Sequence, residues 1–142
     1  MKKSVGKVLD IFINSENREN VSNCEMDNKG IVNDKHYAKD LNRSILLTSI
    51  YSYDLVKDNK ISIDIGLLGE NILIDYNPYD LKAEDNIQIG EVILEVTQKC
   101  TMCEHLSSID KKLPKLLKND RGIFVKVIQK GSIKIGDKVY VV

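Results

Sequence analysis

Short apolar runs with a two-residue period, separated by Gly, Asn and Asp, are the feature that most limits how this chain can fold. In such a run the side chains alternate between the two faces of a strand, so that one face can be buried and the other exposed. Gly, Asn and Asp between the runs are typical of turns. The predicted strands cover residues 5–13, 61–65, 71–75, 91–96, 123–128 and 138–142.

Helical signals are fewer. Thr48 is of a type that caps helices, and apolar residues follow it at helical spacing to about residue 57. A second helix is predicted over residues 104–118, broken into two pieces because Pro114 lies inside it. The polar, Asn-rich residues 14–29 predict a loop or an irregular edge. Many short strands with one or two short helices indicate a mainly β fold, a closed or partly closed β-barrel, forming a single domain over residues 1–142.

The overall charge excludes some classes of partner. Lys and Arg total 21 and so do Asp and Glu, so no basic surface for nucleic acid is expected. No apolar run approaches the roughly 20 residues that cross a membrane, and no leader-like apolar block follows the charged start of the chain. We therefore predict a cytoplasmic protein with neither nucleic acid nor membrane as a partner. Thiols stay reduced in that compartment, and three cysteines are an odd number for a disulfide framework.

The segment from Thr97 to Cys103 carries a Cys-x-x-Cys pair. It follows a predicted strand and leads into a predicted helix, so that Cys103 would lie near a helix N-terminus and close to the cation of Lys99. Both neighbours favour the thiolate, which is the form that attacks sulfur or binds metal.

Three interpretations of the pair remain open, and the third is preferred. A structural zinc site would need two more ligands, at irregular spacings. A thioredoxin-like redox motif would need a βαβ context. The third interpretation is a single reactive thiol, Cys103, with Cys100 accessory. The further candidates for zinc are Cys24, His36 and His105; Cys24 is otherwise interpreted as incidental.

Three other places combine side chains suited to chemistry. The loop at residues 30–38 contains Asp34 and His36, and an imidazole can bind metal or move protons near neutral pH. Two glycines precede Glu70 and Asn71, where a plain turn is the alternative interpretation. Arg121 begins a predicted strand and offers a planar fork suited to phosphate or carboxylate, although a lone Arg most often points to solvent.

Taken in order, these motifs resemble those of a MOSC domain, the module similar to the C-terminal part of molybdenum cofactor sulfurases. The resemblance covers nearly the whole chain, and the characteristic cysteine of the family falls on Cys103. This chain has Asn33 where the family loop has Gly, and Met102 where Pro is more common. Asn tolerates left-handed backbone better than most residues, so the turn can survive the change. The matching segments are residues 33–38, 43–47, 69–71, 89–91, 97–103 and 121–127.

The resemblance implies a β-barrel-like fold and a pterin-based molybdenum cofactor (molybdopterin). Cys103 would either carry sulfur as a persulfide or bind molybdenum directly. The first role implies molybdenum cofactor biosynthesis proteins, a molybdoenzyme or a cysteine desulfurase as partners. The second implies a reductase of N-hydroxylated compounds that depends on an electron-donor protein. Pyridoxal phosphate belongs to a separate desulfurase domain and is not expected in this chain.

The resemblance also implies roles for the candidate site residues. Cys103, His36 and Asp34 form the expected catalytic set. The expected cofactor-binding set is Arg43, Glu70, Asn71, Thr97, Lys99 and Arg121. Its three cations would hold the cofactor phosphate, whereas Glu70 and Asn71, with the His36 loop, would position or protonate the pterin or the substrate. A binding module without activity is a further alternative, supported by the departures at Asn33 and Met102.

Overall fold

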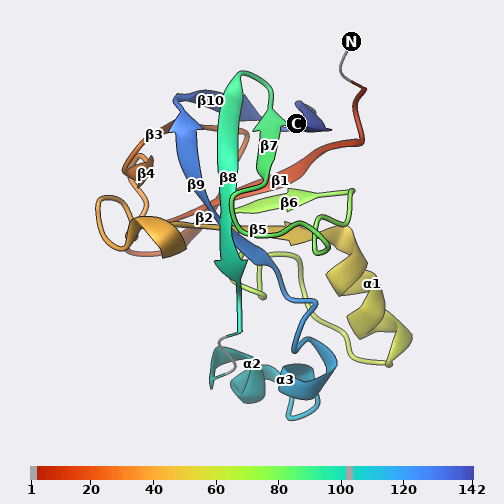
Figure 1. Cartoon of the computed structure of the whole chain (residues 1–142). Helices are drawn as coiled ribbons and strands as arrows, with labels where there is room; N and C mark the ends of the chain where they lie inside the picture. Colours follow the sequence, from red (N-terminus) through yellow and green to blue (C-terminus); the bar gives the residue numbers. More distant parts are fainter. Residues whose placement is uncertain (1–2, 102–103) are drawn as a thin grey trace.

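The computed structural model describes residues 3–101 and 104–142, and it shows a β-barrel with short helices at one end (Figure 1). Seven strands follow one another in the order β11-β7-β8-β9-β5-β6-β1, and pairing of β11 with β1 closes the ring. The expected mainly β barrel is therefore confirmed. These strands are β1 (Gly6–Asn14), β5 (Ile45–Ser49), β6 (Ile72–Ile74), β7 (Asn86–Ile89), β8 (Val92–Lys99), β9 (Ile123–Gln129) and β11 (Lys138–Val141).

The remaining elements attach to this ring. Strand β2 (Arg18–Val21) forms a hairpin with β1, and a second sheet has the order β10-β3-β4. Its strands are β3 (Asn23–Asp27), β4 (Gly30–Ile31) and β10 (Gly131–Lys134). The helices are η1 (Leu41–Arg43), α1 (Ile50–Asp58), α2 (Glu104–Ile109) and α3 (Leu113–Leu116). Helix α1 begins the connection between the parallel strands β5 and β6. No helix in residues 3–101 or 104–142 is long and apolar enough to span a membrane.

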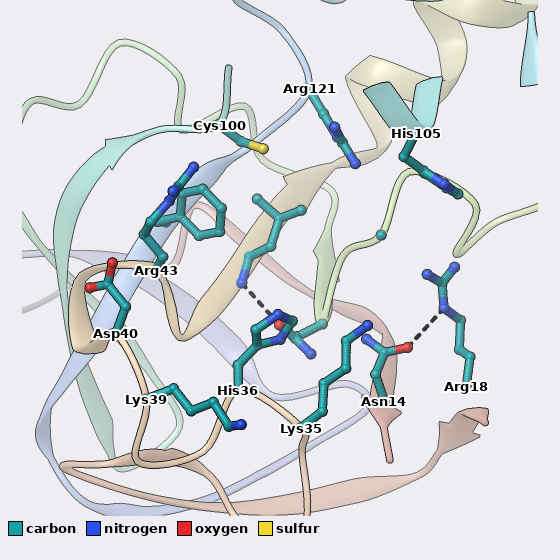
Figure 2. A pocket seen from close by; sticks show the side chains of 14 residues that line it. Asn14, Arg18, Lys35, His36, Lys39, Asp40, Arg43, Cys100, His105 and Arg121 are labelled. Atoms are coloured by element: carbon teal, nitrogen blue, oxygen red, sulfur yellow. Dashed lines mark hydrogen bonds between the residues drawn. The ribbon is translucent and has the colours of Figure 1, made fainter. Parts of the chain in front are cut away.

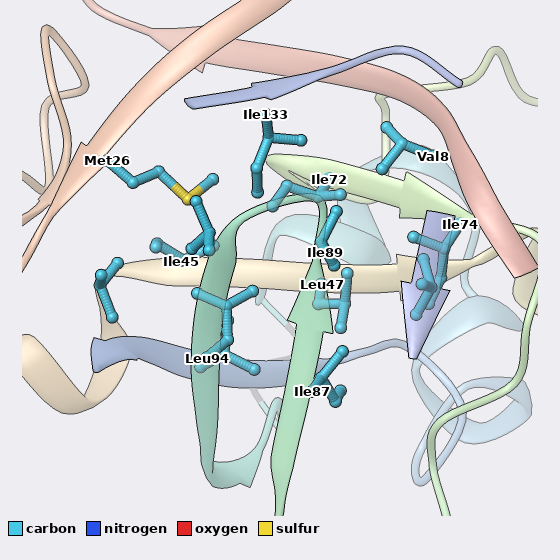
Figure 3. Close-up of a cluster of buried hydrophobic side chains, with 14 of the residues drawn as sticks. Val8, Met26, Ile45, Leu47, Ile72, Ile74, Ile87, Ile89, Leu94 and Ile133 are labelled. Carbon is cyan, nitrogen blue, oxygen red and sulfur yellow. The ribbon is translucent and has the colours of Figure 1, made fainter. Parts of the chain in front are cut away.

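The barrel interior is filled by aliphatic side chains that converge from several strands (Figure 3). Strand β8 shows the reason, because its residues alternate regularly between buried and partly exposed from Val92 to Thr97. Burying each large aliphatic side chain contributes about 1.5–3 kcal/mol. A second apolar cluster joins α1, α2 and α3 beneath the barrel, and it includes Val56, Leu106 and Leu117.

The structure corrects several expected boundaries. Ser49, not Thr48, caps α1, because the Ser49 hydroxyl accepts a hydrogen bond from the amide of Tyr51 at 3.1 Å. The Thr48 hydroxyl instead donates a hydrogen bond to the carbonyl of Arg121. The predicted break in the second helix is real, but it precedes Pro114. That proline lies in the first turn of α3, where a missing amide is tolerated.

Two longer stretches also differ from expectation. Residues 61–65 form no strand in spite of their alternating pattern. The polar residues 14–29, expected to be a loop or an irregular edge, contain β2, at the edge of its sheet, and β3. In β3 the inward positions are Cys24 and Met26, which are 4% and 2% exposed. Cys24 is therefore part of the core and not an incidental residue.

Candidate functional site

A pocket of about 520 Å³ opens at one end of the barrel. Its wall comes from segments far apart in sequence, and Figure 2 shows their side chains reaching it from several sides. The end of β1, the start of β2, the loop before η1, the start of β5 and the end of β8 contribute, together with α2 and the start of β9. The pocket therefore exists only when the barrel is assembled.

The pocket is strongly cationic. Among the described lining residues, five carry a permanent positive charge and one, Asp40, is a carboxylate. Charges gathered in a concave site reinforce one another and attract anions. The chemistry of the lining thus favours an anionic ligand. The five cations are Arg18, Lys35, Lys39, Arg43 and Arg121.

Asp34 supports His36 from behind the pocket wall. The Asp34 side chain is completely buried, whereas that of His36 is 49% exposed and lines the pocket. Burial alone would raise the pKa of Asp34. Hydrogen bonds from the His36 ring and from the amides of Asn14 and His36 outweigh burial and lower this pKa. Asp34 is thus held as a carboxylate that fixes the imidazole.

Asn71 connects three parts of the wall. Its side-chain oxygen accepts from the amide of Leu46 at 3.0 Å, and its nitrogen donates to the carbonyl of Phe12 and to Asp34, both at 3.2 Å. Both amide hydrogens are thereby used. Asn71 lines the pocket but acts mainly as a clamp between β1, β5 and the His36 loop.

Glu70 lies beneath the turn at residues 66–69 and not in the pocket wall. It is completely buried, and Tyr53 donates a 2.5 Å hydrogen bond to its Oε2. Among the described residues its Oε1 has no hydrogen-bond partner. Burial raises the pKa of Glu70, although the hydrogen bonds from Tyr53 and the Gly66 amide oppose this. The geometry assigns Glu70 to support of the turn.

Arg121 and Arg43 both line the pocket, the first as a buried residue and the second as an exposed one. Arg121 is only 5% exposed, and its Nε and Nη2 donate to the carbonyl of Leu68. The guanidinium of Arg43 lies 5.5 Å from the centroid of the Phe124 ring. Cys100 is 3% exposed, packs with Phe124 and lines the same pocket. Planar and cationic groups therefore lie beside a thiol.

The remaining expected residues lie elsewhere. The Thr97 hydroxyl donates to the carbonyls of Asn42 and Phe124, outside the pocket wall. Lys99 is exposed at the end of β8 and does not line the pocket either. Cys103 lies outside the described residues. The structure thus brings together His36, Arg43, Asn71 and Arg121, with Asp34 directly behind them.

Sequence reasoning missed several lining residues. Arg18 follows the end of β1 and was hidden in the polar stretch expected to be a loop. Lys35 and Lys39 flank His36 in the sequence, which was a usable signal for a cationic loop. His105 was considered only as a zinc candidate; it lines the pocket, and its Nε2 lies 3.0 Å from the carbonyl of Leu67. In the part of the chain that the structure describes, no three His, Cys, Asp or Glu residues are grouped to hold a metal ion.

The fold and site define a small closed β-barrel with an anion-attracting pocket at one end. A model of the MOSC domain matches residues 32–140, and the chain belongs to the MOSC domain family, which is associated with molybdenum-cofactor-related functions. The resemblance seen in the sequence motifs is thereby confirmed. No curated protein matches the chain in sequence.

Solved structures share the fold. The YuaD protein from Bacillus subtilis is 19% identical, with a TM-score of 0.84 over 99% of this chain and 98% of that chain. YiiM from Geobacillus stearothermophilus is 17% identical, with a TM-score of 0.69 over 100% of this chain and 75% of that chain. YiiM from Escherichia coli is 14% identical, with a TM-score of 0.64 over 96% and 69%. At these identities the likeness concerns the fold alone.

Proposed function

We propose that this chain binds the molybdenum cofactor in its cationic pocket and carries sulfur on Cys103 for molybdenum cofactor sulfuration or metal–sulfur centre assembly. The observation that carries the proposal is the pocket itself, where five cations face one carboxylate and a cysteine segment adjoins the wall. The cofactor combines an anionic phosphate with a planar pterin, so both charge and shape are relevant to the fit.

The described residues fit such a ligand. The exposed cations Lys35 and Lys39 can bind phosphate oxygens at the pocket mouth, since charge-assisted hydrogen bonds of this type are strong. Gly69 leaves the wall open, because a Cβ there would lie 3.3 Å from the Arg121 Nη2. Arg43 over the Phe124 ring offers a flat surface beside this opening. When bound, the cofactor supplies a metal centre with sulfur ligands.

The thiol assignment follows from the sequence and from its described neighbours. Cys100 and His105 lie on either side of Cys103 in the sequence, and both line the pocket. Chain connectivity is therefore the reason for assigning the Cys103 thiol to this pocket. In the loading step, a persulfide on a cysteine desulfurase passes its outer sulfur to Cys103. The desulfurase regains a thiol and Cys103 becomes the persulfide, with no net oxidation.

His36 would handle the proton in this site. Because the Asp34 carboxylate can only accept, the hydrogen shared with His36 resides on Nδ1, and in the neutral form of the ring Nε2 carries a lone pair. That nitrogen belongs to a half-exposed ring on the pocket wall. We assign to this nitrogen the proton that is released when the Cys103 thiol becomes a thiolate.

The proposed setting is the cytoplasm, with a molybdoenzyme or a cofactor biosynthesis protein as the acceptor of the sulfur.

The test is to purify the protein from cells that make the cofactor and to measure molybdenum, pterin and protein persulfide. Cys103→Ala is compared with Cys100→Ala as the matched control. A transferable persulfide that is lost only in Cys103→Ala supports the carrier role. Bound molybdenum that is lost only in Cys103→Ala indicates instead a metal ligand, and hence the reductase alternative with an electron-donor partner. Absence of cofactor, molybdenum and persulfide from the wild-type protein overturns the proposal.

A further inference from the structure

Residues 61–65 have the pattern of a strand but lack a strand partner. The sequence is Ile-Ser-Ile-Asp-Ile, and it connects the end of α1 to the turn at residues 66–69 (Figure 1). Ile61 and Ile63 are half-buried against the apolar cluster of the helices, whereas Ser62 and Asp64 are exposed. The side chains thus alternate as they do in a strand with one packed face.

The amides inside this segment are unpaired, although its two ends are held: the Ile61 amide donates to the carbonyl of Val56, and the Asp64 carbonyl accepts from the amide of Leu67. Among the described residues, no hydrogen bond is formed by the amides of residues 62–65. Backbone amides and carbonyls need partners, and a strand-like stretch with free groups is a template for pairing with another chain. The residues between Ile61 and Ile65 include neither Pro nor Lys, which commonly protect such edges.

An apolar groove of about 500 Å³ runs along the same segment and α1. Ile61, Ile63 and Ile65 line it, with Val56 on the helix side, and polar residues, among them Ser62, also reach it. Ile65 remains 38% exposed, and Leu67, just beyond it, 37%. An occupant that pairs with the backbone would also cover these side chains, which is how added strands combine affinity with specificity.

We propose that residues 61–65 pair antiparallel with the same residues of a second copy of this chain, across a two-fold axis at Ile63. The pattern supports this occupant because it reads the same in both directions, apolar at 61, 63 and 65 and polar at 62 and 64. Pairing about Ile63 sets Ser62 opposite Asp64 of the second copy, so no two carboxylates are directly opposed. It also places Asp64 diagonal to Lys60 of the second copy, with opposite charge, and to Asp64 of the second copy, with like charge, so that two attractive diagonals stand against one repulsive diagonal. Such a self-complementary contact closes as a dimer.

The register gives a sharp test in Ser62, an exposed residue whose replacement leaves the apolar packing intact. Ser62→Asp places two pairs of carboxylates opposite one another, and Ser62→Lys replaces them with two ion pairs. In sedimentation equilibrium of the full chain, the dimer dissociation constant should rise about tenfold for Ser62→Asp and fall for Ser62→Lys. Ser15→Asp, at an exposed bend away from the segment, should match the wild type.

Hydrogen exchange gives a second readout. Every second amide within residues 62–65, on the edge that pairs, should gain protection as protein concentration rises through the dissociation constant, with no such gain in Ser62→Asp. A wild-type chain that stays monomeric at millimolar concentration overturns the proposal. A dimer that responds equally to Ser62→Asp and Ser62→Lys overturns it as well, because the paired register would then be wrong.

Discussion

The Asp34 carboxylate receives two hydrogen bonds from His36, one from the backbone amide at 3.0 Å and one from the ring Nδ1 at 3.3 Å. The same carboxylate accepts from the amide of Asn14 and from the side chain of Asn71. One buried anion therefore ties the His36 loop to β1 and to the residue that clamps β5. Its loss should affect both stability and the pocket.

Asp34→Asn should lower the free energy of unfolding by about 3 kcal/mol, because hydrogen bonds to a buried charge are lost. The pKa of Asp34 is lowered in the folded state, so its stabilisation is complete above the unfolded pKa and is lost as the pH falls through the folded one. Urea unfolding from pH 7 down to pH 2 should show this acid-dependent loss in the wild type and a smaller loss in the variant. Asp80→Asn, at an exposed position, is the control; equal profiles for all three proteins would contradict the prediction.

Glu70→Gln should have an effect of opposite pH dependence. Burial raises the pKa of Glu70, so the folded state holds a proton that the unfolded state releases. Wild-type stability therefore declines as the pH rises above the unfolded value of about 4.3 and through the folded one. The variant should be about 1 kcal/mol less stable at pH 5, and the gap should shrink or reverse by pH 9. Urea titrations at pH 5, 7 and 9 measure the difference in stability between the two proteins. A difference that widens as the pH rises would contradict the prediction.

Lys35→Glu should weaken binding of an anionic probe to the cationic pocket. Lys35 is exposed and lines the pocket, so we expect the dissociation constant for pyrophosphate to rise roughly threefold to tenfold and more so at low salt. Calorimetric titration measures it. Lys111→Glu makes the same charge change at an exposed position outside the pocket. If both variants weaken binding equally, net charge and not the pocket determines affinity.

Cys24 should resist alkylation in the folded protein. Burial, reinforced by the negative charge of Asp34, raises the pKa of its thiol to about 12, so little thiolate forms at pH 8. With iodoacetamide and peptide mass spectrometry, Cys24 should stay unmodified in the native protein and react fully in concentrated urea. Native labelling at the rate of a free cysteine would show that β3 opens readily.

The barrel was predictable where strand residues alternate between core and solvent. Strand β8 is the clearest example, since its buried residues are every second one. Strands β2 and β3 were missed because their sequences are polar and Asn-rich, and pairing with β1 and β10 forms them in spite of low propensity. At residues 61–65 a strand was predicted that does not form. The alternating pattern is present, but within the described chain this segment has no strand to pair with.

The candidate site was predictable to the extent that local motifs mark it. The His36 loop is one case, and Asn33 adopts a left-handed backbone, with φ 75°, which Asn tolerates better than most residues. Glu70 and Lys99 were expected in the binding set, but neither lines the pocket. Glu70 is buried, and Lys99 is exposed at the end of β8. Arg18 reaches the pocket only through the β1–β2 hairpin, a relationship that residue types alone do not reveal.

Closure of the barrel by β1 and β11 has a consequence for how the protein is made. Gly6 pairs with Val139, so a strand near the start of the chain must wait for one near its end before the ring can close. While the chain is being synthesised, β1 can pair with β6 on one edge and, along Ile11 to Asn14, with β2 on the other, but the part of that second edge at Gly6 and Lys7 stays open until β11 arrives. Such distant pairing slows folding and leaves a nascent edge exposed. The pocket, whose wall depends on the assembled ring, is thus completed only after most of the chain has left the ribosome.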